Sequence, residues 1–94
     1  MHIATCVITL QLYGVDSLKA KRSLVRSLLA RLPRHFNVAV AEIDSQDVWQ
    51  TAVIALVTVG VDNGLLHSKV EKMVSWIESN RPDMVIESYS IEFR

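Results

Sequence analysis

The sequence of 94 residues has little of several residue types, and each shortage excludes a class of protein. One cysteine, Cys6, cannot form an intramolecular disulfide, which favours a reducing compartment and hence the cytoplasm. The longest uninterrupted apolar run, residues 52–57, has six residues. A transmembrane helix needs about 20, and no charged segment followed by an apolar one opens the chain, so we expect no membrane partner and no secretory signal. The formal net charge of zero excludes a polycation that coats nucleic acid along its whole surface.

The residues that are present are those of a globular protein with an uneven charge distribution. Half of them are hydrophobic and 21% are charged. The length suits one domain, so we expect residues 1–94 to share a single core. Residues 1–41 carry six basic and one acidic residue, whereas residues 42–94 carry four basic and nine acidic residues. This asymmetry predicts either a basic face for an anionic partner or two halves that neutralise each other.

Hydrophobic periodicity predicts two helices. Apolar residues at helical spacing indicate the first helix over residues 18–32, capped by Asp16 or Ser17. Pro33 should stop this helix or break it, because proline lacks a backbone N–H. The second helix covers the apolar positions 66–77, and the residue that could cap it is Asp62 or Asn63.

Alternating or β-rich segments predict four strands, over residues 4–12, 37–43, 48–60 and 85–93, with a polar turn at 44–47 between the middle two. Together with the helices they give the order β-α-β-β-α-β. This order is typical of an α+β, ferredoxin-like fold, in which two helices cover one face of a four-stranded antiparallel sheet. The first and third strands should be central.

The third strand is apolar on both sides, so one face of the sheet should remain apolar and open. This predicts a homo-oligomer that associates through the sheet; the alternative is that loops or termini cover the face. Trp49, Val53 and Val57 are the candidate partner-binding residues. Trp49 could anchor a partner, as tryptophan often does in interfaces, or it could simply cover the sheet edge.

Basic residues gather on the first predicted helix. Lys19, Arg22 and Arg26 line one flank of it, while Lys21 falls within the apolar arc and must reach the rim or meet a carboxylate. We hypothesise that Lys19, Lys21, Arg22 and Arg26 contact the phosphates of RNA, helped by the positive end of the helix dipole. The alternative is an internal ion-pair network with the acids of the hairpin, Glu42, Asp44 and Asp47, which the topology should place beside this helix.

The sequence does not favour catalysis. The histidines are scattered singly, no cysteine pair has metal-ligand spacing, and three glycines are too few for a phosphate-binding loop. The centres of the first and third strands also lack the aromatic residues with which an RRM stacks RNA bases. We therefore expect no enzyme activity, no catalytic residue, no metal and no cofactor.

Three segments that occur in this order resemble the YlxP-like family of small bacterial proteins of unknown function. They are residues 17–22 (SLKAKR), 34–42 (RHFNVAVAE) and 46–50 (QDVWQ), and the resemblance spans nearly the whole chain. It implies a ferredoxin-like fold. The genes of the family often lie beside genes for translation initiation and ribosome maturation, which implies a role near the ribosome or RNA. The expected function is a small cytoplasmic RNA- or ribosome-associated binding module, with a homo-oligomeric protein-interaction module as the alternative.

Overall fold

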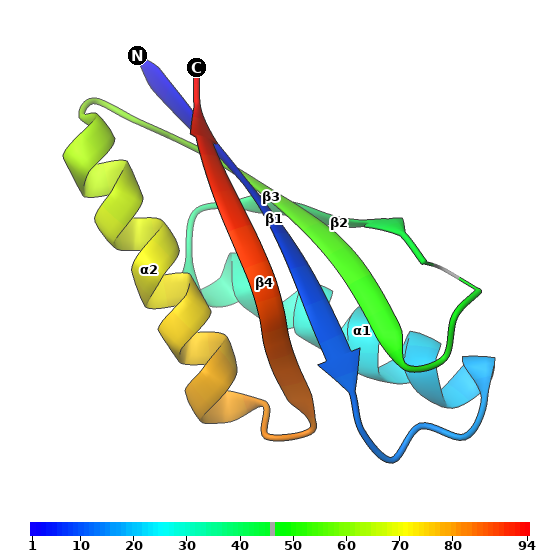
Figure 1. Ribbon diagram of the computed structural model, residues 1–94. Helices are drawn as coiled ribbons and strands as arrows, with labels where there is room; N and C mark the ends of the chain where they lie inside the picture. The colour runs from blue at the N-terminus through cyan, green and yellow to red at the C-terminus, as the bar shows by residue number, and fades with distance from the viewer. Residues whose placement is uncertain (46) are drawn as a thin grey trace.

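The computed structural model describes residues 1–45 and 47–94 and has the predicted order of elements. The four strands form one antiparallel sheet in the order β2-β3-β1-β4, so β1 and β3 are central as predicted. Both helices lie on the same side of this sheet (Figure 1), which confirms the ferredoxin-like α+β fold. The elements are β1 (His2–Leu12), α1 (Leu18–His35), β2 (Ala39–Asp44), β3 (Thr51–Gly60), α2 (Asn63–Asn80) and β4 (Met84–Phe93).

The core lies between the sheet and the two helices because the strands alternate apolar and polar positions. Every second residue of β1 and β3 points to the helices, and each of these apolar side chains is at most 2% exposed. Fully burying one leucine or isoleucine side chain contributes about 1.5–3 kcal/mol. The main contributors from the sheet are Cys6, Ile8, Leu10, Leu12, Ala52, Ile54 and Leu56, and those from the helices are Val25, Leu28, Leu32, Val70, Met73 and Ile77.

Each helix begins at a side chain that accepts a hydrogen bond from its first turn. The hydroxyl of Ser17 accepts from the backbone N–H of Ala20 at 3.1 Å. The carboxylate of Asp62 accepts from the N–H of Leu65 at 2.9 Å. A cap of this kind stabilises a helix by about 1 kcal/mol. Ser17 and Asp62 are therefore the caps, rather than Asp16 and Asn63.

The prediction that Pro33 stops or breaks the first helix is wrong, because α1 continues to His35 with Pro33 inside it. The missing N–H removes one helical hydrogen bond, and this happens in the last turn, where few bonds depend on it. The helix closes when the N–H of Phe36 bonds the carbonyl of Leu32 at 2.9 Å. Leu32 is fully buried, so packing holds the last turn in place.

The hairpin turn is longer than predicted, and β3 begins at Thr51 rather than at Val48. Ser45 adopts a positive φ of 59°, a conformation that non-glycine residues rarely take. The N–H of Val48 then bonds the carbonyl of Ser45 at 3.1 Å and closes the turn. Trp49 consequently precedes the strand, and Gln46 of the QDVWQ segment lies outside the described residues.

Candidate nucleic-acid interface

Lys21 is buried inside the molecule and joins α1 to the hairpin. Its side chain is 0% exposed, and its Nζ lies 3.0 Å from Oε2 of Glu42 on β2. The same ammonium donates a hydrogen bond to the carbonyl of Ser45. That Glu42 oxygen is itself buried and has no hydrogen-bond partner among the described residues. The ammonium and the carboxylate therefore compensate each other's charge. Lys21 therefore forms the internal ion pair of the alternative hypothesis and is not accessible to a phosphate.

The other basic residues of α1 face solvent. Lys19, Arg22 and Arg26 are exposed, and so are Arg31 and Arg34 farther along the helix. Within residues 1–45 and 47–94, none of these five forms an ion pair. The helix also contains no acidic residue between its two ends. The exposed face of α1 thus carries five basic side chains that form no ion pair with a described residue.

Two shallow grooves follow this surface. The first lies among Lys19, Arg22, Ser23 and Arg26 on the helix itself. The second lies between the helix and β2 and is lined by Arg22, Val25, Arg26, Leu29 and Glu42. Both are open rather than enclosed, so the arrangement suits an extended charged backbone that lies along the helix better than a small ligand that must be surrounded.

Arg81 holds the end of α2 against α1, a role that the sequence did not reveal. Its side chain is 8% exposed and lies 3.6 Å from the carboxylate of Asp83. It donates a hydrogen bond to the hydroxyl of Ser27 at 3.2 Å and one to the carbonyl of Leu24 at 3.5 Å. A single arginine after the end of a helix has no periodic pattern, so only the packing of the two helices shows its partners.

The candidate partner-binding residues lie on β3 and in the turn that precedes it. Val53 and Val57 point to the face of the sheet that the helices do not cover, and Val57 is 41% exposed. Trp49 is 43% exposed in the turn that precedes β3. The structure therefore leaves Val57 and Trp49 exposed and Val53 partly exposed, and it places the two valines on the side of the sheet opposite α1.

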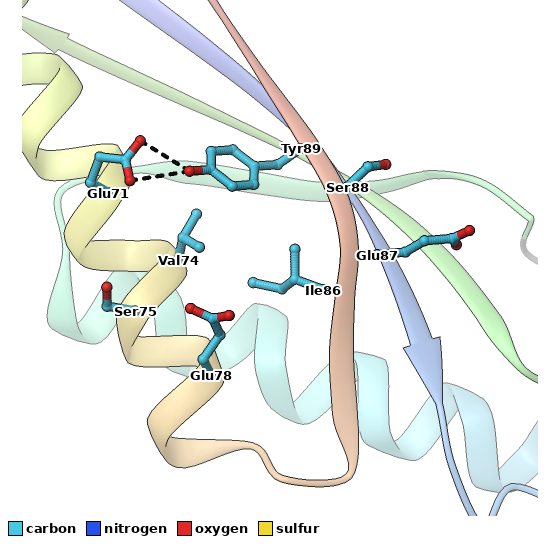
Figure 2. Close-up of a pocket in the computed structure, with 8 residues that line it drawn as sticks. All are labelled: Glu71, Val74, Ser75, Glu78, Ile86, Glu87, Ser88 and Tyr89. Atoms are coloured by element: carbon cyan, nitrogen blue, oxygen red, sulfur yellow. Dashed lines mark hydrogen bonds between the residues drawn. The ribbon is translucent and has the colours of Figure 1, made fainter.

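A third groove, between α2 and β4, has the opposite charge (Figure 2). The carboxylates of Glu71 and Glu78 border it, and the hydroxyl of Tyr89 donates to both carboxylate oxygens of Glu71 at 3.1 Å. That hydrogen bond raises the pKa of Tyr89 above its usual value. An anionic polymer is repelled by this side of the molecule and attracted to α1, which gives it one favourable orientation.

Cys6 does not provide a reactive thiol in the folded protein. It is 1% exposed, and burial together with the charge of Glu71 raises the pKa of the Cys6 thiol to about 11. The thiol is therefore protonated at neutral pH and is a poor nucleophile. In the described part of the chain, no three histidine, cysteine or acidic side chains gather closely enough to hold a metal ion. Neither of the described helices combines the length and the apolar character needed to cross a membrane.

Comparison with known proteins gives the family. Residues 3–90 match the family described as "Protein of unknown function (DUF503)". The chain belongs to the DUF503 family. It is also 29% identical over 68 residues to "Uncharacterized protein YlxP" of Bacillus subtilis (strain 168), across 72% of this chain and 74% of that protein. These matches confirm the resemblance to YlxP-like proteins. Neither the DUF503 description nor that name states an activity or a ligand.

Proposed function

We propose that this DUF503 protein is a non-catalytic cytoplasmic module that binds RNA, on the ribosome or elsewhere, by its phosphate backbone. Lys19, Arg22 and Arg26 make the phosphate contacts, and Lys21 instead fixes the helix that carries them. The observation that supports the proposal is the exposed face of α1, which has five basic residues without an ion-pair partner in the described chain and no acid on the helix.

Contacts to phosphate give affinity without sequence preference, because all nucleotides share the same backbone. Base recognition would require exposed aromatic rings or polar groups that reach base edges. Before its last residue, the exposed face of α1 carries neither an aromatic ring nor an acid that could accept from a base, and the ring of the last residue, His35, already packs 4.8 Å from that of Trp76. The expected binding is therefore weak, sensitive to salt and tolerant of RNA sequence.

Charge reversal on α1 tests this function. The change is Lys19→Glu together with Arg22→Glu, two exposed positions whose replacement leaves the core intact. We expect the doubly substituted protein to lose co-sedimentation with ribosomes and retention on immobilised RNA. The matched control is Lys72→Glu together with Arg94→Glu, which changes the net charge equally at exposed positions away from α1.

Circular dichroism and thermal melting establish that both doubly substituted proteins are folded. Co-sedimentation of the α1 variant at the wild-type level contradicts the assignment. Equal losses in the α1 variant and its control would show that total charge, and not the face of α1, governs binding.

The second candidate function is a homo-oligomeric protein-interaction module that uses the apolar face of the sheet. It is favoured by the exposure of Val7, Val57 and Val59 on the side of the sheet opposite the helices. Raising the salt concentration separates the two functions. Phosphate binding weakens steeply with salt, whereas apolar association persists.

A further inference from the structure

The alternation that builds the core also creates a second, uncovered face of the sheet. Directly paired residues share a face, so the register carries an apolar row from β1 through β3 to β2. Several of its members are well exposed, from 37% for Val7 to 47% for Val59. Both helices lie on the other side (Figure 1). We call this surface the open-face patch: Val7, Ala41, Val53, Ala55, Val57 and Val59.

The open-face patch itself is uncharged, and acidic residues border it on both edge strands. The residues of β1 and β3 that point to this face are aliphatic, threonine or glutamine, whereas β2 ends in Asp44, which pairs with Val53 and so shares the face. The other acids of this face, Glu87 and Glu92, lie on the opposite edge strand, β4. Such a face offers nothing to an anionic polymer, and its small β-branched side chains fit another sheet of the same kind.

The size of the face matches what a stable dimer needs. The three longest strands have 10 or 11 residues, so at about 3.3 Å per residue and about 4.8 Å between four strands the face projects about 600 Å². The accessible area of a ridged surface exceeds its projection. A standard interface buries about 800 Å² per partner, so this face supplies nearly all of one.

We propose that a second copy of this chain covers the open-face patch, with the two sheets stacked face to face about a twofold axis parallel to the strands. This inference rests on the second candidate function and adds the partner and the geometry. The axis is chosen by charge. A twofold axis across the strands would stack β4 on the β4 of the partner and bring the acidic edges together. An axis along the strands puts β4 over the partner's β2, whose one open-face acid is Asp44, so the β4 glutamates of the two copies lie at opposite edges of the dimer.

The register of the sheet then specifies which residues face each other. Ala41, Ala55, Val7 and Ser90 are successive partners across the four strands and form one row. A rotation of the sheet about an axis parallel to the strands leaves this row at the same height along the strands and exchanges the β2 edge with the β4 edge. Ala41 of one copy therefore lies over Ser90 of the partner subunit, and Val7 lies over Ala55 of the partner subunit.

This arrangement leaves α1 free, because the helices lie on the outer side of each sheet. The two basic faces of a dimer point away from each other, so self-association and RNA binding use different surfaces. A dimer can therefore engage two segments of one long RNA or two separate RNA molecules.

Sedimentation equilibrium tests whether the open-face patch is the interface. We expect the wild type to have the mass of two chains at about 100 μM, without a change when salt is raised. Val57→Glu places two like charges in the interface and should raise the dimer dissociation constant on the order of 100-fold. The control is Val61→Glu, at an 85% exposed position beyond the end of β3, and it should leave the mass unchanged.

A charge-pair rescue tests the axis. Ala41→Lys alone and Ser90→Glu alone, both at exposed positions, should each weaken the dimer. The chain that carries both changes should regain the wild-type dissociation constant, because each new lysine lies over a new glutamate of the other copy. If the twofold axis ran across the strands instead, the same double change would bring lysines near lysines and would not restore the dissociation constant.

The outcomes separate the inference from the function on which it rests. A monomeric wild type at about 100 μM overturns both the oligomeric function and the stacked dimer. A dimer that Val57→Glu does not weaken shows association through another surface and overturns the inference. A dimer that is weakened at Val57 but not rescued by the charge pair overturns the proposed axis while the oligomeric function stands.

Discussion

Lys21 shows how one residue can look like a ligand contact and serve the fold instead. It stands among exposed basic residues in the sequence, yet its ammonium is enclosed between Glu42 and the Ser45 carbonyl. Helical spacing placed it in the apolar arc, and the cost of an unpaired buried charge left it two possibilities, to reach the rim or to meet a carboxylate. The same reasoning could not choose which acid of the hairpin would meet it, because the turn geometry around Ser45 decides that.

The first prediction concerns this ion pair. Lys21→Met keeps a similar volume but leaves the partly buried carboxylate of Glu42 without its partner, so we expect the free energy of unfolding to fall by about 3 kcal/mol. Adding Glu42→Gln removes the uncompensated charge and should restore a large part of the loss. Urea denaturation of the wild type, both single variants and the double variant measures the coupling. Additive effects of the two changes would show that the pair makes no specific contribution.

The second prediction concerns Cys6 and the pH dependence of stability. The folded state raises the pKa of this thiol from 9.0 to about 11. Because the neutral form is favoured in the folded protein, this contribution to stability is fully present below pH 9 and is lost as the pH rises towards 11. We expect the free energy of unfolding to fall over that range, and to fall less in Cys6→Ala, although this variant is less stable overall.

Tyr89 provides the control for that measurement. Its pKa is also raised, by the hydrogen bond to Glu71, so it titrates at alkaline pH as well. Tyr89→Phe removes this contribution and should leave the part due to Cys6. If Cys6→Ala and the wild type lose stability equally over the alkaline range, the thiol does not contribute. At neutral pH a thiol reagent should modify native Cys6 far more slowly than the unfolded chain.

At the scale of elements, periodicity predicted the sheet order and both helices, while the ends of elements were less accurate. Apolar alternation over β1 and helical spacing over α2 are local signals that agree with the final packing. The end of α1 beyond Pro33 was missed because burial of Leu32 outweighs one absent hydrogen bond. The start of β3 was missed because the left-handed conformation of Ser45 has no marker in the sequence.

The basic face of α1 was predicted in part, for a similar reason. Spacing alone placed Lys19, Arg22 and Arg26 on one flank, which the structure leaves exposed. Within the described residues they form no ion pair because of where the acids of residues 42–94 lie in the fold, and the spacing of residues along one helix does not predict those positions. The role of Arg81 depends likewise on contacts between residues that are 54 and 57 positions apart in the sequence.

Arg81 gives the prediction at this scale. Arg81→Ala removes the hydrogen bonds to Ser27 and to the Leu24 carbonyl, and we expect a loss of about 2 kcal/mol in the free energy of unfolding. Arg81→Lys should recover little, because an ammonium cannot reproduce the forked geometry of the guanidinium. Arg34→Ala, at an exposed position of α1, is the control and should change stability by less than about 0.5 kcal/mol. Equal stability of Arg81→Ala and Arg34→Ala would contradict the bridging role.

At the scale of the whole molecule, the zero net charge conceals a strong separation of charge. The basic half of the sequence supplies α1, and the acidic half supplies the groove between α2 and β4. The two helices share one side of the sheet, so a dimer stacked on the opposite side would display both charges outward. Each copy then has one orientation in which an anionic polymer is attracted, whatever its oligomeric state.

Salt dependence tests this picture quantitatively. Three phosphate contacts to single-stranded RNA give a slope of about −2 for the logarithm of affinity against the logarithm of salt, so raising salt from about 50 to about 200 mM should weaken binding about 20-fold. Fluorescence anisotropy with a short labelled oligonucleotide measures this at a single α1, because the two α1 helices of the proposed dimer would face opposite directions. Arg26→Ala should reduce the slope by about one contact, or about 0.7, and Lys72→Ala on α2 should leave it unchanged. A slope near zero in the wild type would show that phosphate contacts do not supply the affinity, and a slope that Arg26→Ala leaves intact would place the contacts away from this face of α1.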